Sequence, residues 1–199
     1  MKRLSILMGV LTAALLTLGL GASSASATVL CKTATNPCTG GTYGEGTVIE
    51  ATLKSSSFYP LGALSCSEGS MKGEVTNPGG EGTDVVGTFS SVSFSGCGES
   101  STLTVLKPGS FKIKSPSGGN GTLVWEGFEF TIKPSGIHCV YSGYLETTKL
   151  NLNGGETASL TGSSVIVPRT GGSFVCGSSG QWTVEYTVTA PKPLYVAEK

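Results

Sequence analysis

The sequence predicts an all-β protein, an antiparallel β-sandwich or barrel with an internal duplication, braced by disulfides. Three observations predict it. Apolar and polar residues alternate in successive segments, which is the pattern of half-buried strands. Gly-rich turn sequences such as NPGGEG, SPSGGNG and RTGG separate these segments. Six cysteines and a recurring order of motifs indicate the bracing and the duplication.

The N-terminus has the layout of a secretory signal peptide over residues 1–27. Two basic residues precede an apolar run, and residues 25–27 form a cleavage site of the A-x-A type. Cleavage there leaves Thr28 as the first residue of one mature domain, residues 28–199. No second apolar stretch approaches the roughly 18 residues of a membrane-spanning helix. We therefore expect an exported protein, secreted or associated with the cell envelope, without a membrane span.

Charge and composition argue against several classes of partner. Removal of two basic residues with the signal peptide leaves 11 Lys and Arg against 13 Asp and Glu, a formal charge of −2. So weak a charge provides no basic patch for nucleic acid. A single histidine and the absence of close Cys-x-x-Cys pairs leave no set of metal ligands. We expect no nucleic-acid partner, no metal and no cofactor.

Two parts of the chain, residues of about 46–108 and 121–190, match each other. GTVIEATLK in the first corresponds to GTLVWEGFEF in the second, and a GGE motif and two cysteines follow in each. Five matches keep the same order while their offset drifts only from 73 to 79 residues. We interpret the two stretches as repeat units of one domain.

The cysteines indicate a disulfide framework, because their number is even and the chain is predicted to be exported. They are Cys31, Cys38, Cys66, Cys97, Cys139 and Cys176. If equivalent units bond equivalently, the bridges are Cys66–Cys97 and Cys139–Cys176, with Cys31–Cys38 left over. The alternative joins the two units through Cys66–Cys139 and Cys97–Cys176.

Two segments show the alternation of strands clearly. Residues 124–132, VWEGFEFTI, predict one continuous strand. Its two faces carry Phe128, Phe130 and Ile132 on one side and Trp125, Glu129 and Thr131 on the other. Residues 181–188, QWTVEYTV, predict a second strand. One of its faces carries Trp182, Val184, Tyr186 and Val188.

No residue is assigned a catalytic role. The CGSSGQW stretch at Cys176 matches the signature of papain-like cysteine proteases only in part, and this cysteine has a predicted disulfide partner. His138 is the single histidine, no G-x-S-x-G motif is present, and we expect this side chain at the surface or between strands. Glu126 and Glu129 would suit a glycosidase pair, but three positions apart in one strand they point to opposite faces.

Aromatic residues are the remaining candidates for a binding site. They gather in the second unit and its tail, as Tyr141, Tyr144, Trp182, Tyr186 and Tyr195. Trp182 and Tyr186 are the candidate ligand-binding pair, because the first unit has Leu103 and Lys107 at the matching positions. The alternative is that these rings fill the core.

Several short motifs give the chain a resemblance to known proteins. TVLCK, an early second cysteine in NPC, the SFSGC turn and a closing PLYV are the motifs concerned. With them the chain resembles short exported proteins of soil actinobacteria, which are all-β and have paired cysteines. The resemblance covers nearly the whole chain. It implies export and an all-β fold, and no activity.

These observations favour a secreted, non-enzymatic binding or structural protein of the extracellular space or the cell envelope. Its ligand would be a carbohydrate or a protein. The alternative is a secreted hydrolase that acts on envelope carbohydrate or peptide. A third hypothesis is a protein-binding inhibitor whose disulfide-stapled loops form a rigid recognition surface.

Overall fold

Strands dominate the computed structural model, which describes residues 27–59, 64–98, 101–134, 136–143 and 146–199. Residues 1–26 of the predicted signal peptide and the candidate Tyr144 lie outside these residues. The strands are β1 (Thr28–Cys31), β2 (Val48–Tyr59), β3 (Leu64–Cys66), β4 (Glu68–Asn77), β5 (Val85–Ser95), β6 (Ser101–Lys107), β7 (Ser110–Ser117), β8 (Asn120–Glu126), β9 (Glu129–Pro134), β10 (Cys139–Ser142), β11 (Lys149–Asn153), β12 (Ser159–Gly172), β13 (Ser179–Ala190) and β14 (Tyr195–Glu198). One 3-10 turn, η1 (Phe174–Cys176), precedes β13.

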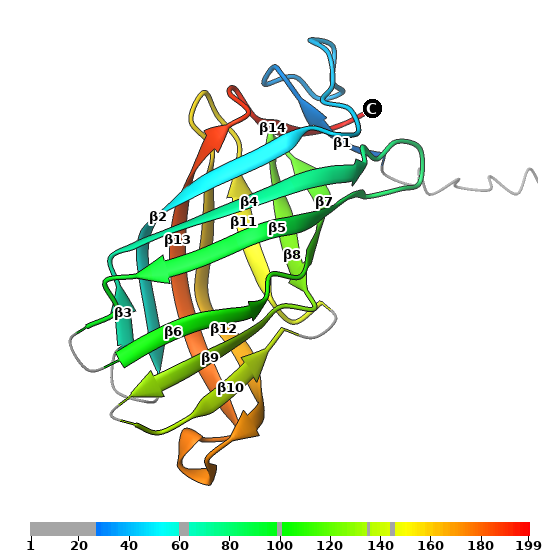
Figure 1. Ribbon diagram of the computed structural model, residues 1–199. Helices are drawn as coiled ribbons and strands as arrows, with labels where there is room; N and C mark the ends of the chain where they lie inside the picture. The colour runs from blue at the N-terminus through cyan, green and yellow to red at the C-terminus, as the bar shows by residue number, and fades with distance from the viewer. Residues whose placement is uncertain (1–26, 60–63, 99–100, 135, 144–145) are drawn as a thin grey trace, which may run out of the picture.

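Eight of these strands close into an antiparallel barrel (Figure 1). The order is β2, β4, β5, β7, β8, β11, β12 and β13, and β13 pairs with β2 to complete the circle. Closure pairs each of these strands on both edges along at least part of its length, so none presents a whole bare edge. The predicted all-β antiparallel fold is confirmed, and the structure decides between its two forms in favour of a barrel.

A side sheet of β10, β9 and β6 branches from the barrel at β12. The first residues of β12, Ser159–Thr161, pair with β11, whereas its last residues, Arg169–Gly172, pair with β10. The 14-residue length of β12 allows this change of partner. At the opposite end of the barrel, β1 and β14 form a separate two-stranded sheet (Figure 1).

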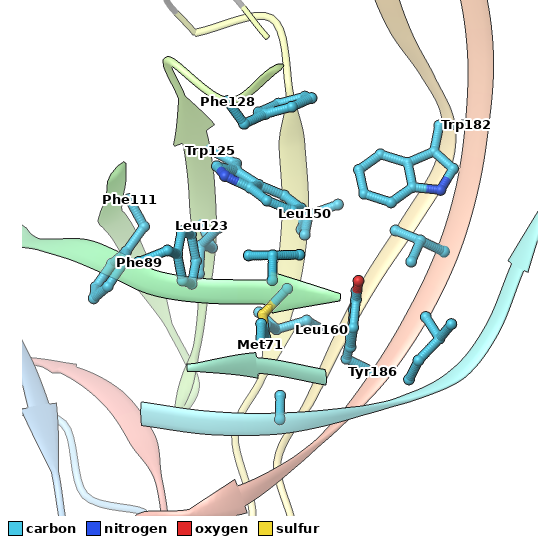
Figure 2. Close-up of a cluster of buried hydrophobic side chains, with 14 of the residues drawn as sticks. Met71, Phe89, Phe111, Leu123, Trp125, Phe128, Leu150, Leu160, Trp182 and Tyr186 are labelled. Atoms are coloured by element: carbon cyan, nitrogen blue, oxygen red, sulfur yellow. The ribbon is translucent and has the colours of Figure 1, made fainter. Parts of the chain in front are cut away.

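Side chains fill the interior of the barrel (Figure 2). The largest of those exposed by 2% or less are Trp125, Trp182, Tyr141, Tyr186, Phe58, Phe111 and Phe128. The rings of Trp125 on β8 and Trp182 on β13 lie 5.6 Å apart between centroids. Buried residues of both predicted repeat units belong to one hydrophobic cluster, so the barrel has a single core.

The continuous strand predicted over residues 124–132 is wrong. β8 ends at Glu126 and β9 begins at Glu129, because Gly127 has a φ of 65° that no regular strand contains. The expectation of a half-buried strand fails as well. Trp125 and Thr131, expected opposite Phe128, are buried as it is.

The disulfides are Cys31–Cys38, Cys66–Cys97 and Cys139–Cys176. This confirms the pairing within units and excludes the pairing between units. Cys66 lies in the connection between β2 and β4, and its partner Cys97 follows β5. Cys139 lies in the connection between β8 and β11, and its partner Cys176 follows β12. In pairing order, β2, β4 and β5 correspond to β8, β11 and β12. The duplication itself stays a prediction, since strand order does not establish a common origin.

Truncation of Trp182 should destabilise the protein far more than truncation of an exposed ring. W182A removes a side chain that is 2% exposed, and we expect a loss of about 3–5 kcal/mol in the free energy of unfolding. F174A removes a ring that is 86% exposed and should change this free energy by about 0.5 kcal/mol or less. Urea denaturation of the two variants measures the difference, and equal losses would contradict the buried position of Trp182.

The disulfide that closes the longer loop should contribute more to stability, because the loop entropy grows with the logarithm of loop length. Removal of Cys139–Cys176, with a separation of 37 residues, should cost about 4 kcal/mol in the loop-entropy account. Removal of Cys31–Cys38, with a separation of 7, should cost about 2 kcal/mol. Paired Cys→Ala variants compared by urea denaturation test this order, and a reversed order would show that strain or packing dominates.

Candidate functional site

Trp182 and Tyr186 point into the barrel and not to the surface. Their exposed fractions are 2% and 0%, and the Trp182 indole nitrogen donates a hydrogen bond of 2.9 Å to the Ser56 hydroxyl. The ring of Phe94 on β5 packs against both of them. The structure therefore places the candidate pair in the core, which is the alternative that the sequence left open, because even-numbered positions of β13 face inward.

The Tyr186 hydroxyl has no hydrogen-bond partner within the described part of the chain. Burial raises the pKa of this phenol far above its ordinary value of 10.0. By contrast, the hydroxyl of Tyr141, another buried ring, donates a hydrogen bond of 2.6 Å to the Cys176 carbonyl. The two tyrosines thus differ in whether their polar atom is satisfied.

The residues considered for nucleophilic catalysis are not assembled. Cys176 is bonded to Cys139 and has no free thiol. His138 is exposed, and its Nε2 lies 3.5 Å from the Thr131 hydroxyl. Among the residues that the structure describes, no Ser hydroxyl or carboxylate lies within hydrogen-bond reach of this ring.

Glu126 and Glu129 line one hollow where the barrel meets the side sheet. The prediction that they point to opposite faces is wrong, because the positive φ of Gly127 turns the chain between them. The hollow has a volume of about 260 Å³. Its lining residues are Lys107, Glu126, Gly127, Phe128, Glu129, Ser142 and Gly143. We call it the junction hollow.

Backbone hydrogen bonds hold the walls of the junction hollow together. The Gly127 N–H donates to the Gly143 carbonyl, and the Gly143 N–H donates to the Phe128 carbonyl, each at 3.1 Å. A Cβ atom on Gly143 would clash with the Phe128 ring. That ring is 1% exposed and packs on Trp125. The floor of the hollow is therefore anchored in the barrel core.

The two carboxylates of the junction hollow have different surroundings. Oε1 of Glu126 is buried, and no described group donates a hydrogen bond to it. Oε2 of Glu129 lies 3.6 Å from the Lys107 ammonium, whose side chain is 67% exposed, so this ion pair is long and weak. The hydroxyl of Ser142 lies 3.2 Å from that of Thr170. The hollow is thus lined by two carboxylates, which are acceptors for a molecule that carries donors.

Comparison with known proteins adds no family to these observations. No family model matches the chain, and neither the curated proteins nor the solved structures include a match. Across the described ranges, no helix has the length and apolar character needed to cross a membrane. In the same ranges, no three His, Cys, Asp or Glu side chains come together as metal ligands.

Sequence reasoning missed the junction hollow because it treated residues 124–132 as one strand. One signal could have revealed the break. Gly127 interrupts the alternation, and a glycine inside a strand pattern indicates a bulge or bend. No sequence pattern indicates that Ser142 and Lys107 meet this bend, since both come from other strands.

Conversion to phenylalanine should change the free energy of unfolding differently at the two buried tyrosines. Y186F removes a hydroxyl without a partner and should leave the free energy of unfolding unchanged or raise it by about 1 kcal/mol. Y141F removes a hydrogen bond and should lower it by about 1 kcal/mol. Urea denaturation at pH 7 measures both.

The pH dependence of stability provides a second readout for Tyr186. The folded state retains the phenolic proton at a pH where the unfolded chain releases it, because burial raises the pKa. Stability is therefore fully present below the ordinary value of 10.0 and falls as the pH rises above it. The decline should be shallower in Y186F, and an unchanged slope would contradict the burial of this hydroxyl.

Proposed function

We propose that the protein is an exported, non-enzymatic binding protein that holds a small ligand rich in hydrogen-bond donors in the junction hollow. A sugar residue, above all an amino sugar of the cell envelope, has this chemistry. The observation that carries the proposal is the buried Oε1 of Glu126, which has no donor within the described chain. A buried carboxylate oxygen without a donor costs free energy, and rotation of the Glu126 side chain toward a ligand hydroxyl or ammonium group in the hollow would offset this cost.

The local charge supports the same class of ligand. The junction hollow is lined by two carboxylates, Glu126 and Glu129, and by one lysine, Lys107. The ammonium of this lysine pairs with Glu129. Glu126 is therefore free to accept a charge-assisted hydrogen bond, which is about twice as strong as a neutral one. An anionic ligand would meet repulsion from the same group.

Export is the second part of the proposal. Three disulfides are typical of an oxidising compartment outside the cytosol. The signal-peptide pattern of residues 1–27 and the resemblance to exported actinobacterial proteins support the same location.

A secreted glycosidase is the second candidate function. It is favoured by the arrangement of Glu126 and Glu129 around one hollow, since most glycosidases use two carboxylates. The volume argues for binding instead. About 260 Å³ is below the roughly 300–1,000 Å³ of typical small-molecule sites, so it suits one sugar residue better than the two that flank a scissile bond.

Substitution of Glu126 should abolish most ligand binding. E126Q keeps the shape of the side chain but replaces the buried carboxylate oxygen, and we expect affinity for glucosamine to fall about tenfold or more. E74Q is the matched control, because Glu74 is exposed on β4 and lies outside the hollow. Isothermal titration with glucosamine and with N-acetylglucosamine measures binding and shows whether the ammonium or the hydroxyl groups are recognised.

Two results would count against the binding proposal. If neither sugar binds the wild type, or if E126Q and E74Q bind alike, the junction hollow is not the ligand site. Release of nitrophenol from aryl glycosides, lost in both E126Q and E129Q, would instead establish the hydrolase.

A further inference from the structure

The strands β5 and β6 lie side by side and run in opposite directions, yet they do not pair with each other (Figure 1). β5 pairs with β4 along one edge, but on its other edge it pairs with β7 only over residues 85–88. β6 pairs with β9 on one edge and ends the side sheet on the other. Residues 91–95 of β5 and residues 101–105 of β6 therefore each have one free edge. We call the space between these two edges the strand slot.

A hollow of about 330 Å³ lies at one end of the strand slot. Residues 94–98 line it on one side and residues 101–104 on the other. The Cys66–Cys97 disulfide ties the first of these walls to β3. The chain thus leaves β5 toward β3 before it enters β6, and the two strands do not close into a paired hairpin.

The hydrophobic core is incompletely covered at the strand slot. In the described part of the chain, three half-buried apolar residues pack against the main core cluster, and two of them, Phe94 and Val105, lie on the two sides of the slot. The ring of Phe94 packs against those of Trp182 and Tyr186, with centroids 5.8 and 6.5 Å apart. A strand placed in the slot would cover this margin of the core, because every second side chain of a strand points to the same face.

The two free edges lack the features that protect most edge strands. Exposed edges usually carry Lys, Pro or a bulge, which prevent pairing with other chains. Residues 91–95 are SVSFS and residues 101–105 are STLTV, without charge or proline. The bulges in the pairings of β5 and β6 lie outside both stretches. Two unprotected edges on either side of uncovered core residues are what remains when one strand of a sheet is missing.

This geometry selects the occupant. Each edge presents backbone donors and acceptors at the spacing of a strand, and only an extended segment has matching rows of both on its two sides. With uncharged edges, recognition depends on backbone hydrogen bonds and apolar contact, which suits neither an ion nor a sugar. A second copy of this chain has no spare strand within the described residues, because all fourteen strands are already paired.

We propose that the strand slot binds an extended segment of another protein by strand addition. The segment pairs with residues 91–95 on one side and with residues 101–105 on the other, and its inward apolar side chains cover Phe94 and Val105. Insertion closes a second ring, in which the segment joins β5 to β6 and the order continues through β9, β10, β12, β13, β2 and β4. The two edges are then about 9–10 Å apart. This site shares no residue with the junction hollow, so the two proposals fail independently.

Peptide selection followed by hydrogen exchange tests the proposal. Nine-residue peptides displayed on phage are selected on the purified protein with its disulfides intact, and the best binder is synthesised. We expect this peptide to have alternating apolar residues and no central proline. When it binds, amide exchange should slow about tenfold or more in residues 91–95 and 101–105. The amides of β2 should not change, because this strand is paired on both edges along most of its length.

Methylation of the peptide backbone distinguishes a strand held on both edges from a peptide that merely adheres. N-methyl groups on the odd-numbered residues remove the donors of one edge, and those on the even-numbered residues remove the donors of the other. Each modified peptide should bind about tenfold or more weakly than the unmodified one. Loss of affinity in one series alone would reduce the contact to a single edge and overturn the insertion.

Variants of the protein locate the site. F94S removes the apolar contact beneath the slot and should weaken peptide binding about tenfold or more. F174S is the matched control, because it makes the same substitution at the exposed Phe174 of η1 and should change the affinity less than about twofold. E126Q should also leave the affinity unchanged. Binding lost in E126Q and kept in F94S would assign the peptide to the junction hollow.

Three further outcomes would overturn the proposal. Slow exchange of residues 91–95 and 101–105 in the protein without peptide would show that their edges are not free. Failure of the selection to yield any peptide that protects both stretches would show that the slot accepts no strand. Protection of both stretches by a rise in protein concentration alone would make the slot a contact between copies of this chain.

Discussion

The packing of Trp125 against Trp182 inside the closed barrel is the contact on which the rest of the structure depends. These rings come from β8 and β13, and their centroids lie 5.6 Å apart. Together with Phe128 they fill the part of the interior shown in Figure 2, where a wider barrel would hold a ligand. The chain itself therefore fills this part of the interior with its own side chains.

The outer features arise where the barrel pattern is interrupted. At Gly127 the chain leaves β8 and turns into the side sheet, and this turn creates the junction hollow. At the far end of β12 the strand exchanges β11 for β10, and the exposed turn η1 follows. Both features rest on rigid neighbours, the first on the buried Phe128 ring and the second on a disulfide. Irregular segments supported by a regular frame are where binding residues are commonly placed.

Much of the fold could be predicted from sequence because its signals are local. The alternation of Trp182, Val184 and Tyr186 describes one strand with one buried face, and the structure has it so. Comparison of two parts of the chain favoured the pairing of Cys66 with Cys97 over the pairing between units, and the structure has it so. The strand over residues 124–132 failed because a single glycine outweighed the alternation around it. An alternating pattern indicates which residues share a face of a strand, but it does not indicate where the strand ends.

The sequence by itself determined that this chain forms antiparallel strands and that Trp182 and Tyr186 share a face, and it narrowed the pairing of the cysteines to two alternatives. Alternation and cysteine spacing carry that information along the chain. Only the tertiary structure decided which side of β13 faces the core, because a buried face and a face prepared for a ligand have the same alternating pattern. It also decided that Glu126 and Lys107 lie at one hollow and that Phe174 stands exposed. Such positions depend on strand closure, which brings together residues that no local pattern connects.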